Sequence, residues 1–411
     1  MAGDATLALI RAFIVLVGAT AAVSLIARRF SIPYTVALVA LGLAGGAILR
    51  PAGPELPPEL VLTVLLPGLI FEAAYRIDVR VLRPSIVSVF VLAGPGVLMV
   101  AALVAVALRV GVGLPLPIGF VAGAIVAATD PAAVIASFKR LGAPHRLSTL
   151  VEAESLFNDG TGIVLFTIAV AAVGRPAGVV DSVLGFVSII VISSLIGVAA
   201  GFAASWLIVR VRDHLVELSI SLVLAYGSAL LAGAIGQSGI IAAAVAGMTL
   251  GNRGRTLGLS NRTLQAMDTV WEFLAFLLSA LVFLLVGAAI PITELAGAAL
   301  PIFVAVVAVQ AGRAVLVYGV VAGLGRLLRG RAGSVIPAPW QHIVFWSGLR
   351  GAVSVALALA LPADFPMRAL VQEIVFGVVV FTLAIQATTV DNLMAWLKIG
   401  HREHDEPAPG T

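Results

Sequence analysis

The sequence predicts an all-α polytopic membrane protein with about 13 transmembrane helices. Of its 411 residues, 61% are hydrophobic and only 11% are charged, and the mean hydropathy is +1.12. A soluble globular protein carries about 25% charged residues. The apolar residues fall in repeated runs separated by short polar stretches, and about 20 helical residues cross the ~30 Å hydrocarbon core of a bilayer. These observations exclude a soluble protein.

The apolar runs follow one another along the whole chain, and each is long enough to enter the bilayer. The first is followed by its basic residues, Arg28 and Arg29, so we predict a membrane span there and not a cleaved signal peptide. We expect one membrane domain over residues 1–400 and a short, disordered tail over 401–411. The predicted spans are about 6–27, 32–49, 59–75, 84–108, 115–137, 148–173, 181–209, 216–234, 238–252, 267–290, 297–325, 337–361 and 367–396.

The distribution of basic residues supports this count of spans. Eighteen Lys and Arg residues follow odd-numbered spans and four follow even-numbered spans, while Arg11, Arg313 and Arg350 lie within spans. Lys and Arg concentrate in cytoplasmic loops. We therefore expect the amino terminus outside and the carboxyl terminus in the cytoplasm. The excess of Lys and Arg is explained by their role in orienting the spans, so it does not indicate nucleic-acid binding. We expect no nucleic-acid partner.

Several function classes lose support from what the chain lacks. It has no cysteine, which excludes disulfides and thiolate metal sites. It has no Gly-Lys-Ser/Thr phosphate-binding motif, so nothing indicates that ATP drives it. We expect no cofactor and no enzymatic activity.

The sixth span contains the most informative polar residues. Glu152, Glu154 and Asp159 lie in it, although one charged residue at mid-span costs roughly 2.5–3.5 kcal/mol. Ser155, Asn158 and Asp159 recur at helical spacing and share a face. A buried carboxylate with oxygen-rich neighbours can bind a dehydrated Na⁺ or Li⁺, or a proton, but not both. Such a group supports coupled exchange. We expect Glu152, near the helix entrance, to be solvated.

Two spans carry signals that break a helix. In the fifth, Thr129 and Asp130 precede Pro131, whose ring disrupts the helix near Ala127. In the twelfth, glycines flank Arg350. The twelfth span is the seventh after the fifth, so the two breaks cross the membrane in opposite directions. This arrangement favours an inverted repeat in which spans four to six match spans eleven to thirteen.

The remaining buried charges need partners. We predict an ion pair between Glu154 and Arg350. For Arg313 a structural and a neutralising role both stay open, and Glu72 either faces the same cavity or lies at the interface near Arg76. The small-residue stretches 42–46 and 197–201 indicate helix-packing faces.

Four motifs resemble the monovalent cation:proton antiporters, in the sodium/hydrogen exchanger branch. Their order and spacing match, and the resemblance extends from the first span to about Trp396. The motifs are Leu69-Ile70-Phe71-Glu72-Ala73, Ala128-Thr129-Asp130-Pro131, Glu154-Ser155-Leu156-Phe157-Asn158-Asp159-Gly160 and Gly348-Leu349-Arg350-Gly351-Ala352.

The resemblance implies a fold and an assembly. It implies an antiporter fold of 13 helices with two crossed, unwound helices, forming a homodimer with elevator-type alternating access. Interface helices would come from about 6–108 and 216–290, and core helices from about 84–173 and 297–396. The expected location is the bacterial inner (plasma) membrane, with a role in sodium and pH homeostasis.

The resemblance also implies roles for individual residues. Asp159 would bind cation and proton in competition, and Thr129, Asp130 and Ser155 would complete the Na⁺ site, with Glu72 contributing in a subset of the family. Glu154, Asn158 and Arg350 would form the supporting network, to which we add Arg313. Electrogenic relatives have Asp where this chain has Asn158, so exchange of one Na⁺ or Li⁺ for one proton is expected to be electroneutral.

Three alternatives remain open. Ligand types alone do not select among alkali cations, so K⁺/H⁺ exchange is the main rival. A cation channel would be built from rings of carboxylates rather than one asymmetric cluster. An intramembrane enzyme would use Asp130 and Asp159 as a catalytic dyad, but the chain lacks metal-ligand clusters and a nucleophile–base pair.

Overall fold

A computed structural model of the chain describes residues 14, 17–23, 25, 27, 33–49, 60–174, 178–211, 213–256, 261–290, 292–327 and 336–400. Most of the predicted first span, the pair Arg28–Arg29 and the tail 401–411 lie outside these residues. The described part of the chain forms helices and contains no strand, which confirms the all-α prediction.

Eight helical stretches among the described residues are long and apolar enough to cross a membrane, and a shorter apolar helix covers Tyr34–Gly46. The total of 13 spans stays a prediction. The first half of the chain forms α2 (Tyr34–Leu49), η1 (Val61–Leu65), α4 (Leu66–Arg76), α5 (Val79–Leu82), η2 (Arg83–Ser85), α6 (Ile86–Ala93), α7 (Pro95–Val112), α8 (Leu116–Ala127), α9 (Ala132–Leu141) and α10 (His145–Gly174).

The second half continues as helices of similar length, several of them joined end to end. They are α11 (Val179–Ile208), α12 (His214–Ala234), α13 (Gly239–Thr256), α14 (Asn261–Ala289), α15 (Ile292–Leu295), η3 (Ala296–Ala298), α16 (Ala299–Ala314), η4 (Val315–Val321), α17 (Ala322–Leu327), α18 (Ala338–Trp346), α19 (Ala352–Leu359), α20 (Arg368–Phe381), η5 (Thr382–Gln386) and α21 (Ala387–Trp396).

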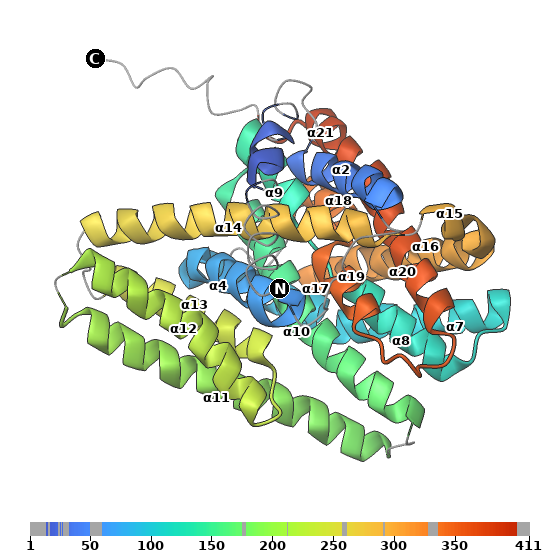
Figure 1. Cartoon of the computed structure of the whole chain (residues 1–411), viewed down its shortest axis with the longest axis horizontal. Helices are drawn as coiled ribbons and strands as arrows, with labels where there is room; N and C mark the ends of the chain where they lie inside the picture. Colours follow the sequence, from blue (N-terminus) through green and yellow to red (C-terminus); the bar gives the residue numbers. More distant parts are fainter. Residues whose placement is uncertain are drawn as a thin grey trace, which may run out of the picture.

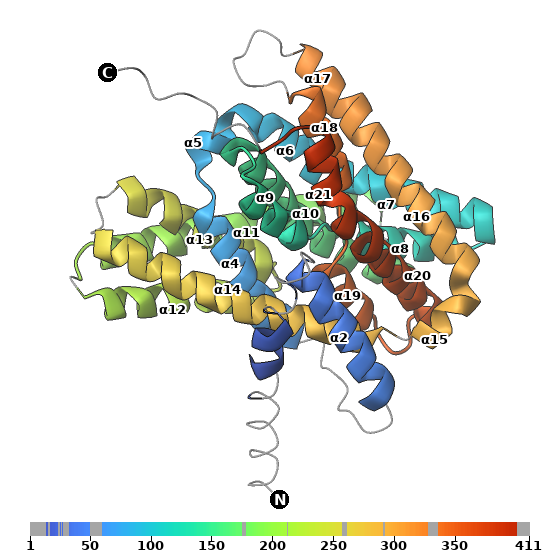
Figure 2. The ribbon, with the colours of Figure 1, turned by 90° about the horizontal axis from the view of Figure 1, so that it is seen from above.

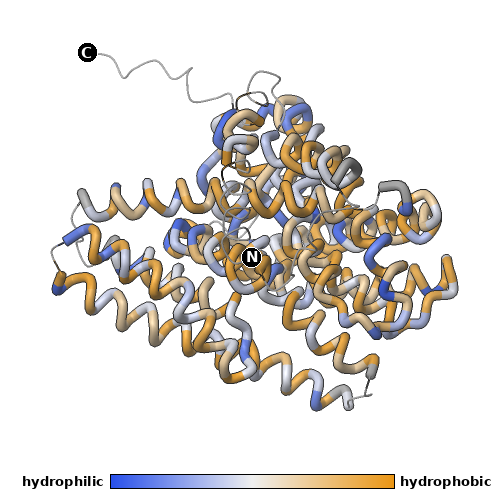
Figure 3. Tube along the Cα trace, in the orientation of Figure 1, coloured by the Kyte–Doolittle hydropathy of each residue, from blue (hydrophilic) through white to orange (hydrophobic). Residues whose placement is uncertain are grey.

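The helices form two groups that lie side by side (Figures 1 and 2). One group contains α4 and α11–α14, together with α2, which packs on α14, and the other contains α7, α8, α16 and α18–α21. The helix α10 contacts both groups, since it packs on α6 and α8 as well as on α11 and α13. The sixth predicted span therefore lies at the boundary between them. Hydrophobic residues predominate along the helix lengths (Figure 3), and many large apolar side chains are exposed, as expected for a protein surrounded by lipid.

Glycines bring helix backbones into direct contact within the first group. A Cβ atom added at Gly42 of α2 would overlap the carbonyl oxygen of Leu284 in α14, and one at Gly251 of α13 would overlap that of Tyr75 in α4. Gly197 of α11 approaches the backbone of α13 in the same way. Close backbone approach of this kind is typical of helix packing in membranes. The predicted packing roles of Gly42 and Gly197 are confirmed.

Both predicted helix breaks are present. The fifth span is divided into α8 and α9, with residues 128–131 outside the helices, and the twelfth is divided into α18 and α19 by residues 347–351. The two unwound segments meet, because the backbone N–H of Asp130 donates a hydrogen bond to the carbonyl oxygen of Leu349 (N···O 2.9 Å). Two broken helices thus cross beside α10.

Candidate ion-binding site

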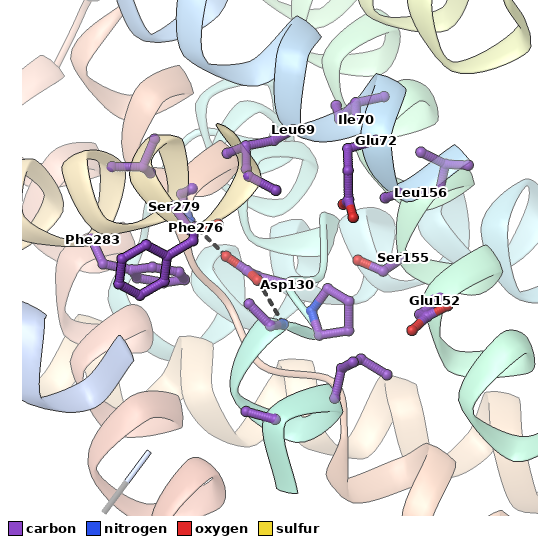
Figure 4. A pocket seen from close by; sticks show the side chains of 18 of the residues that line it. Leu69, Ile70, Glu72, Asp130, Glu152, Ser155, Leu156, Phe276, Ser279 and Phe283 are labelled. Carbon is purple, nitrogen blue, oxygen red and sulfur yellow. Dashed lines mark hydrogen bonds between the residues drawn. The ribbon is translucent and has the colours of Figure 1, made fainter. Parts of the chain in front are cut away.

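A cavity of about 740 Å³ lies between the two helix groups and reaches the crossing point (Figure 4). Asp130 of the first break lines it, together with Ser155 and Asp159 of α10 and Glu72 of α4. Its wall also includes charged residues at helix ends and near the surface, namely Arg76, Lys139, Arg140 and Glu272. The cavity therefore joins the predicted ion site to the surface.

Asp159 is the carboxylate with an unused acceptor at the inner end of this cavity. Its side chain is 9% exposed, and its Oδ1 atom has no hydrogen-bond partner among the described residues. Burying an ionised carboxylate without a partner is costly. The Asp159 carboxylate lines the cavity, so its charge is available to a cation or a proton that enters.

Asp130 caps the amino-terminal ends of two half-helices. Its Oδ1 accepts the backbone N–H of Ala132 at 3.0 Å, and its Oδ2 accepts that of Ala352 at 3.2 Å. These are the first residues of α9 and α19, where helix N–H groups lack internal partners and the helix dipole favours negative charge. Asp130 thus holds the two breaks together while it faces the cavity.

Two buried arginines cap the opposite, carboxyl-terminal ends. Arg350, 1% exposed, donates from Nη1 to the carbonyl oxygens of Ala127 (2.7 Å) and Ala128 (2.8 Å) at the end of α8. Arg313 donates from Nε to the carbonyl oxygen of Phe345 (2.9 Å) near the end of α18. Cations are favourable at helix carboxyl ends, where carbonyl groups lack internal partners. At the crossing, the two amino-terminal helix ends therefore face a negative charge, and the two carboxyl-terminal ends face a positive charge.

The predicted ion pair between Glu154 and Arg350 is wrong. Glu154 pairs with Arg313 instead, with Nη1···Oε1 at 2.7 Å and Nη2···Oε2 at 3.2 Å, and both side chains are almost fully buried. The guanidinium of Arg350 is held by the carbonyl oxygens of α8, whereas α16 brings Arg313 to the face of α10 that carries Glu154. Arg313, whose role the sequence left open, neutralises Glu154.

Asn158 and Thr129 connect this ion pair to the first break. The amide Nδ2 of Asn158 donates to the hydroxyl Oγ1 of Thr129 (3.0 Å) and to Oε1 of Glu154 (3.3 Å). Ser155 donates from its hydroxyl to the carbonyl oxygen of Thr129. Thr129 is buried and does not line the cavity, and in this conformation its carbonyl and hydroxyl oxygens accept hydrogen bonds from residues of α10.

Glu72 and Glu152 lie on the cavity wall. Glu72 lines the cavity and forms an ion pair with Arg76, while its position at the membrane interface stays a prediction. Glu152 was expected to be solvated outside the site, but it is partly buried and lines the cavity. Sequence reasoning missed Tyr34 of α2 and Ser279 of α14, which also line it, because nothing distinguishes them from other polar residues in spans.

The chain resembles known transport proteins over nearly its whole length. A profile of the family "Sodium/hydrogen exchanger, transmembrane" matches residues 13–396. The Na⁺/H⁺ antiporter ApNhaP of Aphanothece halophytica is 40% identical over 368 residues, which cover 88% of this chain and 69% of that protein. The Na⁺/H⁺ antiporter NhaH of Halobacillus dabanensis is 32% identical over 93% of this chain and 96% of its own length.

The fold is also shared with a solved structure. The sodium proton antiporter MjNhaP1 from Methanocaldococcus jannaschii, determined at pH 8, aligns with a TM-score of 0.77 at 20% identity, covering 95% of this chain and 99% of that one. This similarity confirms the antiporter fold predicted from the sequence. Together with the two crossed helix breaks and the extent of the sequence match, it shows that this multi-pass membrane protein belongs to the sodium/hydrogen exchanger family.

Proposed function

We propose that the chain is an electroneutral antiporter that exchanges one Na⁺ (or Li⁺) for one H⁺, with Asp159 binding cation and proton in competition. The observation that carries this proposal is the buried carboxylate of Asp159, which lines a cavity that reaches the surface and whose Oδ1 atom has no hydrogen-bond partner among the described residues. The Na⁺/H⁺ antiporters to which the chain is similar support the choice of ions.

The buried charges at the crossing support a one-to-one exchange. Two are positive, Arg313 and Arg350, and three carboxylates are negative, Asp130, Glu154 and Asp159. With all of them ionised, the crossing has a net charge of −1. Either one Na⁺ or one proton brings it to zero, and a neutral site is far cheaper to move through hydrocarbon than a charged one. Both loaded forms can then cross, whereas the empty form cannot.

Within this proposal the cation at Asp159 would also use oxygens from nearby residues of the cavity wall. Ser155 and Asp130 line the same cavity, and Na⁺ prefers oxygen ligands of this kind. Thr129 would join the site through its carbonyl or hydroxyl group when the hydrogen bonds from α10 rearrange. Asn158, Glu154, Arg313 and Arg350 hold the geometry and are not ligands.

Alternating access would be produced by movement of the core helices against the interface helices, with the cavity lying on their boundary. Arg76, Lys139 and Arg140 lie on the cavity wall, and the positive-inside rule places all three on the cytoplasmic side. The structure would then be open to the cytoplasm. The exposed apolar side chains of α12, such as Val223 and Leu230, lie within the expected interface helices and suit contact with a second copy in a homodimer.

The experiment that tests the proposal uses purified protein in liposomes with an imposed pH gradient and the membrane potential clamped. Internal pH is followed while Na⁺, Li⁺, K⁺ or choline is added in turn. Collapse of the gradient by Na⁺ and Li⁺ alone, at a rate that is the same at two clamped potentials, is the expected result. Collapse by K⁺ as well would assign general alkali-cation exchange. Absence of any response would refute antiport.

Replacement of the central carboxylate provides the control. Asp159→Asn should abolish exchange and leave the elution profile and melting temperature of the protein unchanged. Asp181→Asn removes the same charge from the exposed start of α11 and should exchange ions as the unmodified protein does. Normal exchange by Asp159→Asn would remove Asp159 from its central role.

A further inference from the structure

The helix that carries Asp159 presents a second carboxylate to the cavity. Glu152 lies seven residues before Asp159 and three before Ser155, and all three line the cavity. Spacings of three and seven place side chains on one helix face, and the rise of 1.5 Å per residue separates the two carboxylates by about 10 Å along α10. Figure 4 shows Glu152 and Ser155 on the same helix at the cavity wall.

Apart from Asp159 itself, Glu152 is the carboxylate of this wall that lacks an ion pair or hydrogen bond among the described residues. Glu72 forms an ion pair with Arg76, Asp130 accepts two backbone N–H groups, and Glu272 lies 3.7 Å from the guanidinium of Arg76. Within the described part of the chain, Glu152 has neither an ion pair nor a hydrogen bond to its side chain. Its charge therefore acts on the contents of the cavity.

One positively charged side chain on the cavity wall, that of Lys139, counteracts the effect of Glu152 on an entering cation. Lys139, in the last turn of α9, lines the same cavity, is exposed and has no ion-pair partner among the described residues. Its neighbour Arg140 also lines the cavity but is paired with Asp391 of α21. Glu152 and Lys139 are thus the two unneutralised charges that an entering ion meets before it reaches Asp159.

We propose that Glu152 attracts the transported cation into the cavity, that Lys139 opposes it, and that their balance sets the half-saturating cation concentration. This inference rests on the proposed function, and it adds a residue that neither binds the ion at Asp159 nor belongs to the supporting network. A unit charge about 10 Å away in a partly hydrated cavity changes local cation occupancy by roughly two- to tenfold. The effect concerns binding and not the translocation of the loaded site.

The first test measures exchange by Glu152→Gln and Lys139→Gln in liposomes over a range of Na⁺ concentrations. Glu152→Gln should raise the half-saturating Na⁺ concentration roughly two- to tenfold, and Lys139→Gln should lower it by a similar factor, while the maximal rate stays constant. The double variant should return close to the unmodified protein. Glu152→Asp, which keeps the charge, should stay within about twofold. Glu294→Gln, which removes a carboxylate from exposed α15 away from the cavity, serves as the matched control.

A second readout separates electrostatic attraction from a structural effect. Raising the ionic strength with an inert salt shortens the Debye length from about 30 Å at 0.01 M to about 8 Å at 0.15 M. The difference between Glu152→Gln and the unmodified protein should shrink accordingly, whereas a packing defect would persist. An unchanged half-saturating concentration in Glu152→Gln, or a loss of maximal rate alone, would overturn the inference. Absence of exchange in the unmodified protein would instead refute the proposed function.

Discussion

The buried ion pair between Glu154 and Arg313 allows a quantitative prediction. Arg313→Met keeps a long, flexible side chain but removes the guanidinium. Glu154 then stays buried without a counter-charge, and the carbonyl oxygen of Phe345 loses its donor. Breaking a buried pair by removing one partner costs about 3–5 kcal/mol, and the lost hydrogen bond adds about 1 kcal/mol. We expect a total destabilisation of about 4–6 kcal/mol.

The assay is thermal unfolding in detergent, followed by the loss of the monodisperse elution peak after heating. One kcal/mol corresponds to roughly 1.2 °C for a chain of this size, so the apparent melting temperature should fall by about 5–7 °C. Arg368→Met is the matched control, because Arg368 also donates to a backbone carbonyl oxygen, that of Leu361, but is only partly buried and has no carboxylate partner among the described residues. It should shift the melting temperature by about 1 °C.

A second substitution tests the cause of the loss. In the double variant Glu154→Gln, Arg313→Met no charge is left unpaired, and replacement of both partners of a buried pair is often close to neutral. The double variant should therefore recover more than half of the lost melting temperature. If Arg313→Met behaved like Arg368→Met, or if the double variant were less stable than either single variant, the pair would not carry the stability assigned to it.

Two further predictions concern the unwound segments. A Cβ atom in Gly351→Ala would overlap the carboxylate of Asp130, which two backbone N–H groups hold in place. Exchange should therefore be lost, and the free energy of unfolding should fall by about 1–3 kcal/mol. The control Gly233→Ala has open space at its Cβ position and should leave exchange unchanged and the protein equally or slightly more stable. Ser155→Ala removes the hydroxyl that donates to the carbonyl oxygen of Thr129 and that lines the cavity with Asp159. The half-saturating Na⁺ concentration should rise about tenfold, while the free energy of unfolding should fall by only about 1 kcal/mol. An unchanged Na⁺ dependence would exclude Ser155 from the ion site.

The helix breaks were predictable because their causes are local. Pro131 cannot continue a helix, and glycines beside Arg350 permit an extended segment, so both positions could be located from their neighbours in sequence alone. The packing around them explains the glycines further. Gly348 leaves room for the guanidinium of Arg313, and Gly351 leaves room for the carboxylate of Asp130.

The pairing of charges was not predictable in the same way. Two buried arginines, Arg313 and Arg350, were available to Glu154. The choice depends on which helix end each arginine must cap, and that is decided by the approach of α16, 159 residues away in sequence. Glu152 was misjudged for a related reason. Its position near a helix entrance indicates solvent, whereas the tertiary structure places that entrance inside the cavity.

The glycine contacts within the first helix group also determine where the molecule can deform. Helix backbones that are in contact at Gly42, Gly197 and Gly251 cannot slide past one another without steric overlap. The helices α2, α4, α11, α13 and α14 therefore behave as one rigid body. The structure can deform more easily at the cavity wall, where side chains such as Leu69 and Phe276 lie between this rigid body and the broken helices. Strain imposed by the surrounding bilayer would therefore be relieved beside the proposed ion site, so that membrane thickness and tension would influence the rate of the proposed exchange.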